Sequence, residues 1–294
     1  MSAPTVPPVL TPLMRGYEWG TRYVFAEPPR MALGAMGNLL SRRSGSSLEF
    51  MEHREYLPGD DLRRIDWNAF ARSDRLAVKM YREEVHPQVD LLLDCSRSMR
   101  LAETRKNEAA LALAGFFAAT AAESHFSFAV HLAEEGCRKL GRSNLLPSEW
   151  EPFEFNGTQS PAESLERMAP AWKPRGIRIV ISDLLFPADP DTLVSRIATE
   201  SAVAVFVQLL AEADAEPPGH GNLRLTDVES GERMEFYLDA GARERYQSNL
   251  ARHQENYHLA CRRHGAHFTT VRAESFLENP DPGDLLHAEL LRYK

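Results

Sequence analysis

Apolar residues along the chain fall into two kinds of segment. Short continuous runs are rich in leucine and β-branched residues, which is typical of strands buried on both faces of a sheet. Longer segments with helical spacing separate these runs. The alternation predicts a parallel, doubly wound α/β sheet. The main predicted strands are 89–93, 126–132, 177–182 and 203–210, and the helices between them are 104–124, 160–168 and 189–200.

The segment at 222–239 departs from this rhythm. Two stretches with alternating apolar residues flank Glu-Ser-Gly-Glu at 229–232, a turn sequence that predicts an inserted β-ribbon outside the parallel core. A long helix at about 240–264 follows. We then expect a last strand at 267–271 and a terminal helix at 285–293.

The first 88 residues differ from the remainder and predict an N-terminal arm and a separate lobe. The spacing of apolar residues at 10–25 predicts a short amphipathic helix. Pro-Gly-Asp at 58–60 predicts a tight turn, after which Asp60 or Asp61 caps a short helix that extends to Arg72. We therefore divide the chain into an arm and Arg/Asp/Trp-rich lobe at 1–88 and an α/β domain at 89–294.

A cluster of oxygen-bearing side chains follows the buried run at 89–93. The chain there reads Asp-Cys-Ser-Arg-Ser, which places Asp94, Ser96 and Ser98 at the predicted carboxyl end of a strand. Open α/β sheets bind ligands at that edge. One carboxylate and two hydroxyls are hard donors that suit a small hard cation such as Mg²⁺. The motif therefore predicts part of a metal site.

Two later segments add donors in a matching order. Thr158 follows a glycine just before a predicted helix, and Asp183 follows the buried run at 177–182. The whole set resembles the metal-ion-dependent adhesion site of von Willebrand factor A-like domains. The resemblance implies a von Willebrand factor A-like, Rossmann-type fold and a bound Mg²⁺ or other divalent cation. The five implied ligands are Asp94, Ser96, Ser98, Thr158 and Asp183.

Helix capping is the alternative for most of these side chains. Asp94 and Asp183 could be helix N-caps, and Ser96 or Ser98 could cap the helix that follows. We favour the metal site, because carboxylates that end two buried strands are costly to bury without a cation or hydrogen-bond donors.

Residues 49–84 carry a second and more specific pattern. An Arg-x-Tyr-x-Pro-Gly-Asp stretch and an Ile-Asp-Trp-x-x-x-Ala-Arg stretch precede the Asp-x-Ser-x-Ser strand. This order resembles the bacterial domain-of-unknown-function 58 family over about residues 45–210. The matching positions are Arg54, Tyr56, Pro58, Gly59, Asp60, Arg64, Ile65, Asp66, Trp67, Ala71 and Arg72.

The resemblance implies a partner more than a reaction. Members of that family are often encoded beside MoxR-type AAA+ ATPases, which implies an adaptor or chaperone-like partner of such an ATPase. In an adhesion-type site, the protein leaves one coordination position of the metal open, and an acidic side chain of the partner fills it.

The block around Trp67 allows two interpretations. Its arginines and Asp66 could form a satisfied charged network that clamps the lobe to the sheet. They could equally be a partner surface, since Trp and Arg dominate binding hot spots. We favour the clamp and expect Trp67 to flank a buried helical stripe. The stripe residues are Leu62, Ile65 and Ala69.

An enzyme is the second hypothesis for function. Asp94 beside Mg²⁺ could accept a phosphoryl group, as in haloacid-dehalogenase-type phosphatases. That chemistry needs a second carboxylate two residues later as general acid, and Ser96 stands there instead. The sequence also contains no P-loop, nucleophile-elbow, zincin or dinucleotide-binding motif. We therefore expect a binding protein without catalytic residues.

Composition narrows the class of partner. The chain of 294 residues is 43% apolar, enough to bury a sizeable core, and carries a net charge of −8. This charge argues against nucleic-acid binding, which depends on clustered Lys and Arg. The three cysteines have no metal-binding or disulfide spacing, so we expect reduced thiols. They are Cys95, Cys137 and Cys261.

The sequence also bears on location. The N-terminus has no signal-peptide pattern, and the longest nearly apolar run, 109–122, is too short for a membrane span. We expect a cytoplasmic protein without stable membrane insertion. The histidines at 253, 258, 264 and 267 do not share one helix face, which favours a solvated surface over a second metal site.

Overall fold

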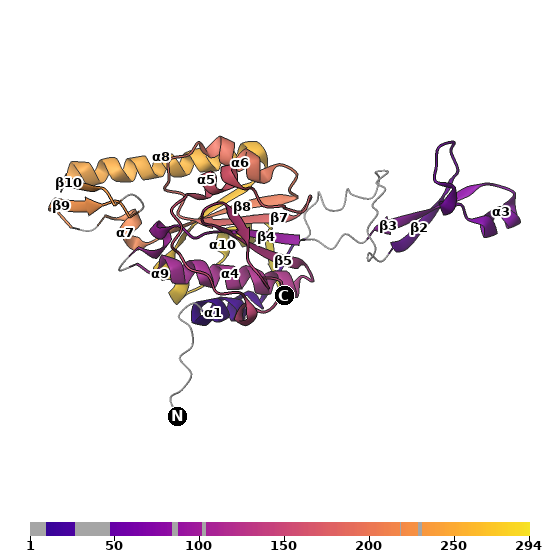
Figure 1. Ribbon diagram of the computed structural model, residues 1–294, viewed down its shortest axis with the longest axis horizontal. Helices are drawn as coiled ribbons and strands as arrows, with labels where there is room; N and C mark the ends of the chain where they lie inside the picture. The colour runs from indigo at the N-terminus through magenta and orange to yellow at the C-terminus, as the bar shows by residue number, and fades with distance from the viewer. Residues whose placement is uncertain (1–9, 27–47, 84–87, 102–103, 218, 229–230) are drawn as a thin grey trace, which may run out of the picture. The chain divides into compact units, whose positions relative to one another are not determined.

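A computed structural model describes residues 10–26, 48–83, 88–101, 104–217, 219–228 and 231–294 of the chain. Contacts divide the chain into two units (Figure 1). The larger unit comprises residues 1–28 and 87–294, and the smaller comprises residues 29–86. The predicted arm at the extreme N-terminus lies outside the described residues.

Six strands form the main sheet of the larger unit. Neighbouring strands are parallel except for the last pair, which is antiparallel. The predicted α/β protein with a mostly parallel sheet is thus confirmed. In spatial order the strands are β11 (His267–Arg272), β8 (Val203–Leu210), β7 (Ile177–Ser182), β4 (Gln88–Asp94), β5 (Ser127–Ala133) and β6 (Cys137–Lys139).

The strand order creates a switch point between β4 and β7. Strand β5 lies on one side of β4, and the chain then crosses back so that β7, β8 and β11 extend the sheet on the other side. The five parallel strands therefore have the doubly wound order 2-1-3-4-5. In sheets of this kind, ligands bind outside the carboxyl ends of the two strands that flank the switch. Those ends carry Asp94 and, directly after β7, Asp183.

Helices cover both faces of the sheet, as the continuous apolar strands require. Alternate residues of β4, such as Leu91 and Leu93, pack in a core with helix α4 (Lys106–Glu123). Leu92 faces the other core, which contains α6 (Pro190–Ala198) and α8 (Ala240–His264). Figure 1 shows α4 and α8 on opposite sides of the sheet.

Helix α1 (Leu10–Gly20) belongs to the larger unit, because it packs directly on α4. The two backbones approach so closely that a Cβ atom at Gly16 would lie 1.8 Å from the carbonyl oxygen of Ala112. The predicted boundary at residue 88 grouped this segment with the Arg/Asp/Trp-rich lobe. The close contact with α4 places it with the sheet instead.

The C-terminal segment differs from the prediction. The expected terminal helix at 285–293 is wrong, because α10 (Gly283–His287) ends early and the chain then forms strand β12 (Leu291–Tyr293). Strand β12 pairs antiparallel with β1 (Tyr23–Phe25), and Leu291 is buried there. Helix α9 (Ala273–Glu278) connects β11 to this region. Helical spacing near the terminus could not reveal a strand partner 266 or more residues earlier.

The inserted β-ribbon is confirmed. It consists of β9 (Gly221–Thr226) and β10 (Arg233–Leu238), which pair antiparallel. The ribbon follows the short helix α7 (Glu212–Ala215) and leads into α8. The remaining elements of the larger unit are η3 (Arg97–Arg100), η4 (Pro147–Glu149) and α5 (Pro161–Arg167). Within the described residues, no helix combines the length and apolar character needed to cross a bilayer.

The smaller unit is built on the antiparallel strands β2 (Leu48–Glu55) and β3 (Ala77–Glu83). The predicted Pro-Gly-Asp turn is present, and the Asp60 amide donates to the carbonyl of Leu57. The single helix predicted from there to Arg72 is wrong. It is split into η2 (Leu62–Arg64) and α3 (Trp67–Ser73), because Ile65 and Asp66 are extended and contact β3 instead.

Candidate metal centre

Asp94 is the last residue of β4, and only 1% of its surface is exposed. Its two carboxylate oxygens accept hydrogen bonds from neutral donors. The amide of Ser96 donates to Oδ1 at 2.9 Å, and the hydroxyl of Ser182 donates to Oδ2 at 2.6 Å. Within the described part of the chain, no cationic side chain forms an ion pair with Asp94.

The surroundings of Asp94 disfavour its ionised form. Burial, together with the nearby carboxylate of Asp183, raises the pKa of Asp94 to about 7, although the hydrogen bonds from Ser182 and Ser96 act in the opposite direction. A cation placed beside Asp94 would favour the ionised carboxylate.

Asp183 is paired with a lysine that sequence analysis did not single out. Lys106, the first residue of α4, is 1% exposed, and its ammonium lies 3.0 Å from Asp183 Oδ2 and 3.0 Å from Asp214 Oδ2. Burial lowers the pKa of Lys106, but the two carboxylates raise it further, so the net pKa lies above the ordinary lysine value. Two of three neighbouring carboxylates thus share one ammonium, and the third, that of Asp94, lies beside Asp183 with neutral donors, which leaves the edge short of positive charge. The three carboxylates belong to Asp94, Asp183 and Asp214.

The two serines of the motif lie side by side after Asp94. Their Oγ atoms are 2.9 Å apart, and Ser96 is buried. Neighbouring oxygen ligands of an octahedral Mg²⁺ are also about 2.9 Å apart, since each lies about 2.1 Å from the ion. No cluster of three or more His, Cys, Asp or Glu side chains suited to a metal occurs among the described residues. Any metal centre here therefore depends on hydroxyl donors, and the carboxylate and two hydroxyls form a set suited to a hard cation.

Backbone contacts hold the Thr158 loop against this motif. Gly157 bridges to Ser96: its amide donates to the Cys95 carbonyl at 2.9 Å, and its carbonyl accepts from the Arg97 amide at 3.0 Å. A Cβ atom at position 157 would lie 3.0 Å from the Cys95 oxygen and 3.0 Å from the Cα of Glu134. A side chain here would force the neighbouring backbone to shift by a few tenths of an ångström. Thr158 comes directly after this contact and is exposed.

Helix capping is not the role of the motif serines or of Thr158. Ser96 is the N-cap of η3 but makes no side-chain capping hydrogen bond, and Ser160, not Thr158, caps α5. Asp94 and Asp183 each accept a hydrogen bond from the amide two residues later, as aspartates often do in turns. These bonds use one oxygen of each carboxylate.

A strained turn follows Asp183. Leu184 is buried yet has a left-handed backbone, with φ of 56°. This conformation costs about 1–2 kcal/mol for a residue with a side chain, and such strain is concentrated at functional sites. The Leu184 amide donates to the Ser182 hydroxyl oxygen at 3.0 Å, and its carbonyl lies 2.7 Å from His253 Nε2. Nothing in the local sequence distinguishes this leucine.

Other polar residues singled out in the sequence have separate surroundings. His258 packs edge-on against Phe268, and His264 lies 3.2 Å from an Asp191 oxygen. His267, on β11, has its pKa lowered by burial. The three cysteines are buried free thiols.

In the smaller unit, Asp66 lies at the centre of a network of hydrogen bonds and charged groups. Asp66 is 6% exposed and caps α3, accepting from the amides of Asn68 and Ala69 at 2.9 and 3.1 Å. His53 Nε2 lies 2.7 Å from its other oxygen, and Lys79 lies at 3.6 Å. The His53 hydrogen bond and the Ala69 amide lower the pKa of Asp66 to about 2.

Trp67 does not take part in this network. The expectation that it flanks a buried stripe is wrong, because 61% of its surface is exposed. The break at Ile65 and Asp66 turns α3 away from the direction that one continuous helix would have, and α3 has no buried residue. Leu62 is exposed as well, and only Ile65 of the predicted stripe is fully buried.

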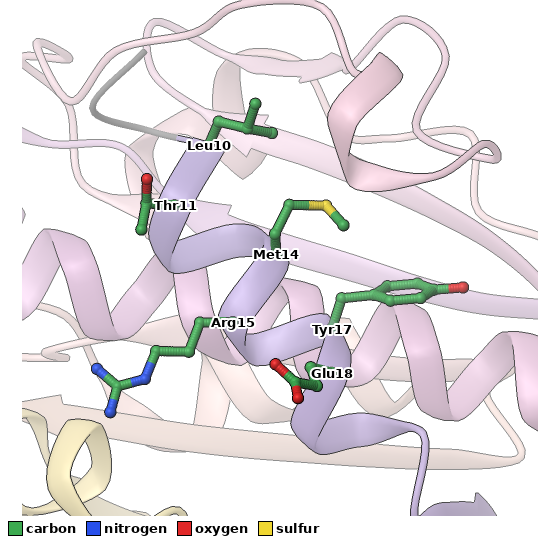
Figure 2. Close-up of a pocket in the computed structure, with 6 residues that line it drawn as sticks. All are labelled: Leu10, Thr11, Met14, Arg15, Tyr17 and Glu18. Atoms are coloured by element: carbon green, nitrogen blue, oxygen red, sulfur yellow. The ribbon is translucent and has the colours of Figure 1, made fainter. Parts of the chain in front are cut away.

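A depression on the outer side of α1 is unrelated to the metal centre. Figure 2 shows that all its lining residues come from this one helix, with Met14 and Tyr17 on one side and Arg15 on the other. It contains none of the five predicted ligands. Its lining residues are Leu10, Thr11, Met14, Arg15, Tyr17 and Glu18.

Comparison with known proteins identifies relatives of unknown function. The family described as "Protein of unknown function DUF58" matches residues 52–256, more than half of the chain. An uncharacterized protein of Mycobacterium tuberculosis is 25% identical over 250 residues, which cover 81% of this chain and 78% of the relative. An uncharacterized protein of Mycobacterium avium is 31% identical over 100 residues, covering 34% of this chain and 59% of that protein.

Two solved structures show distant likeness. One is the crystal structure of the conserved hypothetical protein BatB from Bacteroides thetaiotaomicron, with 9% identity, a TM-score of 0.31, and coverage of 65% of this chain and 96% of that chain. The other is an aerotolerance-related membrane protein from Bacteroides fragilis, with 11% identity, a TM-score of 0.35, and coverage of 65% and 95%. Scores this low carry no argument about fold or function.

Proposed function

The chain belongs to the DUF58 family, and from that premise we propose that it is a metal-dependent protein-interaction domain with a von Willebrand factor A-like fold. The observation that carries the proposal is the shortage of positive charge at the carboxyl edge of β4 and β7. Among the described residues, Asp94 is buried beside Asp183 with neutral donors, while the buried ammonium of Lys106 is held by Asp183 and Asp214. A divalent cation supplies the missing charge.

Each predicted ligand has a distinct part in this site. Asp94, Ser96 and Ser98 would hold the ion directly, because they come from one short motif and their oxygens lie close together. Thr158 and Asp183 would complete the site directly or through water. Lys106 pairs with Asp183 and fixes its orientation. The bound cation would offer an open coordination position to a carboxylate of a partner protein.

The proposed partner is a MoxR-type AAA+ ATPase, and the proposed location is the cytoplasm. The family resemblance supports this partner, and the net charge of −8 argues against nucleic acid as an alternative. A specific complex must bury on the order of 1,200 Å² or more, so a metal-bridged carboxylate would be one contact within a larger interface. Removing the metal should therefore weaken this complex without necessarily dissolving it.

The proposal can be tested by biolayer interferometry with the ATPase encoded beside this gene. Binding is measured with Mg²⁺, with Ca²⁺ and with EDTA, for the wild type, for Asp94→Ala and for Asp281→Ala, which removes an exposed carboxylate of the same unit. We expect EDTA and Asp94→Ala to weaken binding and Asp281→Ala to leave it unchanged. Equal affinity in all conditions removes the metal from the interface, and no binding at micromolar concentrations removes this partner.

The phosphohydrolase alternative remains a separate hypothesis. It would use Asp94 as the nucleophile, and Ser96 occupies the position where that chemistry needs a carboxylic acid. A colorimetric assay with a generic phosphate ester and Mg²⁺ tests it. Turnover that disappears in Asp94→Asn would favour the enzyme over the binding protein.

A further inference from the structure

Helix α8 reaches the turn after β7 by two hydrogen-bonded routes. His253 Nε2 lies 2.7 Å from the carbonyl oxygen of Leu184. A carbonyl oxygen only accepts, so Nε2 carries the hydrogen in this contact. Gln254 Nε2 donates to the side-chain oxygen of Gln208 at 2.9 Å, and Gln208 Nε2 donates to the Asp183 carbonyl at 3.0 Å. His253 therefore contacts the Leu184 carbonyl directly, and the next residue, Gln254, reaches the Asp183 carbonyl through Gln208.

The same turn orients the buried carboxylates of Asp94 and Asp183. The left-handed backbone of Leu184 directs its amide to the oxygen of Ser182, whose hydroxyl donates to Asp94 Oδ2 at 2.6 Å. The next amide, of Leu185, donates to Asp183 Oδ1 at 3.1 Å. If the turn relaxed to an ordinary backbone conformation, both hydrogen bonds would be lost. The orientation of Asp94 and Asp183 thus depends on a strained conformation that something must maintain.

We propose that His253 is a positioning residue for the metal centre: its hydrogen bond to Leu184 holds the strained turn that orients Asp94 and Asp183. This inference rests on the proposed function, because it assigns the turn a role in cation binding. His253 itself contacts neither carboxylate through any hydrogen bond described for it. It acts through the Leu184 peptide, as groups that orient metal ligands commonly do.

The alternative is that His253 only fills space. Its ring packs edge-on against Tyr257, with ring centres 5.1 Å apart, and Tyr257 is fully buried in the core beneath α8. A space-filling role would be kept by an apolar side chain of similar size. A hydrogen-bonding role would be kept by an amide side chain. The variants His253→Leu and His253→Gln therefore separate the two roles.

The test measures two quantities for each purified full-length variant at constant pH. Isothermal titration gives the affinity for Mg²⁺, and hydrogen exchange of the metal-free protein reports the protection of the Leu184 and Leu185 amides. His264→Leu is the matched control, because it removes a histidine of the same helix that contacts Asp191 instead.

We expect His253→Leu to lose roughly tenfold or more in Mg²⁺ affinity, the range found when groups that orient metal ligands are removed. The same variant should exchange the two amides faster than the wild type does. His253→Gln should stay close to the wild type in both measurements, and so should His264→Leu.

Each other outcome has a definite meaning. If His253→Leu binds Mg²⁺ as the wild type does and protects both amides equally, or if Leu and Gln variants lose affinity alike, the positioning role is wrong. If the wild type binds no Mg²⁺ while His253→Leu still loses protection, the proposed metal centre fails and the support of the turn by His253 stands. If neither Mg²⁺ binding nor a change in protection is found, both fail.

Discussion

Asp94 in the larger unit and Asp66 in the smaller unit are both buried aspartates at the centre of a sequence motif, yet their pKa values move in opposite directions. The pKa of Asp94 is raised to about 7, whereas that of Asp66 is lowered to about 2. Little surface of either residue is exposed, 1% for Asp94 and 6% for Asp66, but Asp94 lies deep in the larger unit, where burial is the main cause of its raised pKa. The exposed surface of a residue alone therefore does not decide the charge state of these carboxylates.

Depth of burial raises the pKa of Asp94, and the groups around each carboxylate account for the rest of the difference. Asp66 receives two backbone amides at the start of α3, the His53 ring and the nearby Lys79. Asp94 receives one amide and one hydroxyl, and it faces Asp183 instead of a cation. Both carboxylate oxygens of Asp66 thus have hydrogen-bond or charged partners within its own unit. Asp94 lacks a positively charged partner among the described residues. For this reason we propose a cation site at the carboxyl edge of the sheet.

The largest effect on stability should come from replacing Lys106, whose ammonium partly neutralises the carboxylates at this edge. Lys106→Met leaves the buried Asp183 and the partly buried Asp214 without their cation, and breaking a buried pair in this way costs about 3–5 kcal/mol in the free energy of unfolding. Urea denaturation without metal measures it. Arg54→Met, which breaks the half-exposed pair with Asp60 in the smaller unit, should have a much smaller effect. Equal losses of stability in the two variants would show that the buried and the half-exposed ion pairs contribute alike.

Asp94→Asn should stabilise the metal-free protein at neutral pH. Because the folded-state pKa of Asp94 lies above the ordinary value of 3.8, the unfolded chain releases its proton first as the pH rises. The free energy of unfolding therefore falls between about pH 4 and pH 7, by up to about 4 kcal/mol. Asn does not titrate, so the variant should not show this decrease in the free energy of unfolding.

Denaturation of wild type and Asp94→Asn across that pH range checks the prediction. Asp66 gives the opposite control: its lowered pKa contributes stability above about pH 4, which is lost as the pH falls toward 2. Asp66→Asn should therefore lower stability at neutral pH. A stabilising Asp66→Asn, or an Asp94→Asn without effect, would contradict the contrast between the two sites.

Gly157→Ala should have an intermediate effect confined to the larger unit. The added Cβ would lie 3.0 Å from two backbone atoms, so the Thr158 loop must move away from the Asp94 motif. Overpacking of this kind costs about 1–3 kcal/mol, and Mg²⁺ affinity should fall with it. Gly241→Ala near the start of α8 is the control, because its Cβ would meet only side-chain atoms, the nearest at 3.4 Å. Similar melting temperatures for both variants would show that the close approach is unimportant.

Trp67→Ala should have the smallest effect on stability. Its side chain is mostly exposed and lies outside the Asp66 network, so the free energy of unfolding should change by no more than about 0.5 kcal/mol. Thermal melting of the purified variant measures this. A large fall in melting temperature would support the clamp interpretation. An unchanged melting temperature with lost ATPase binding would assign Trp67 to the partner surface.

Patterns within single segments predicted much of the fold and the two strand ends where the candidate site lies. The buried runs before Asp94 and Asp183 identified two strand ends, and the strand order places those ends on either side of the switch point. The ribbon at 221–238 was also predicted, since its turn and its alternation are local features. These predictions succeed because period and turn chemistry are properties of neighbouring residues.

Features that depend on distant residues were not predicted. Lys106 contacts an aspartate 77 residues away, and the strained Leu184 is held by His253, 69 residues away. The exposure of Trp67 follows from the contact of Ile65 and Asp66 with β3, which splits the predicted helix. A lysine at the start of an otherwise apolar helix was the one available signal for Lys106.

The most direct test is a titration of Mg²⁺ into the wild type and Asp94→Asn by isothermal calorimetry, at a pH below and a pH above 7. We predict saturable binding by the wild type that strengthens as the pH rises, because Mg²⁺ and the proton compete for Asp94. Asp94→Asn should bind at least tenfold more weakly, as expected when a ligand is lost. Equal binding by both proteins, or no binding by the wild type at either pH, would contradict the assignment of this edge as a metal centre.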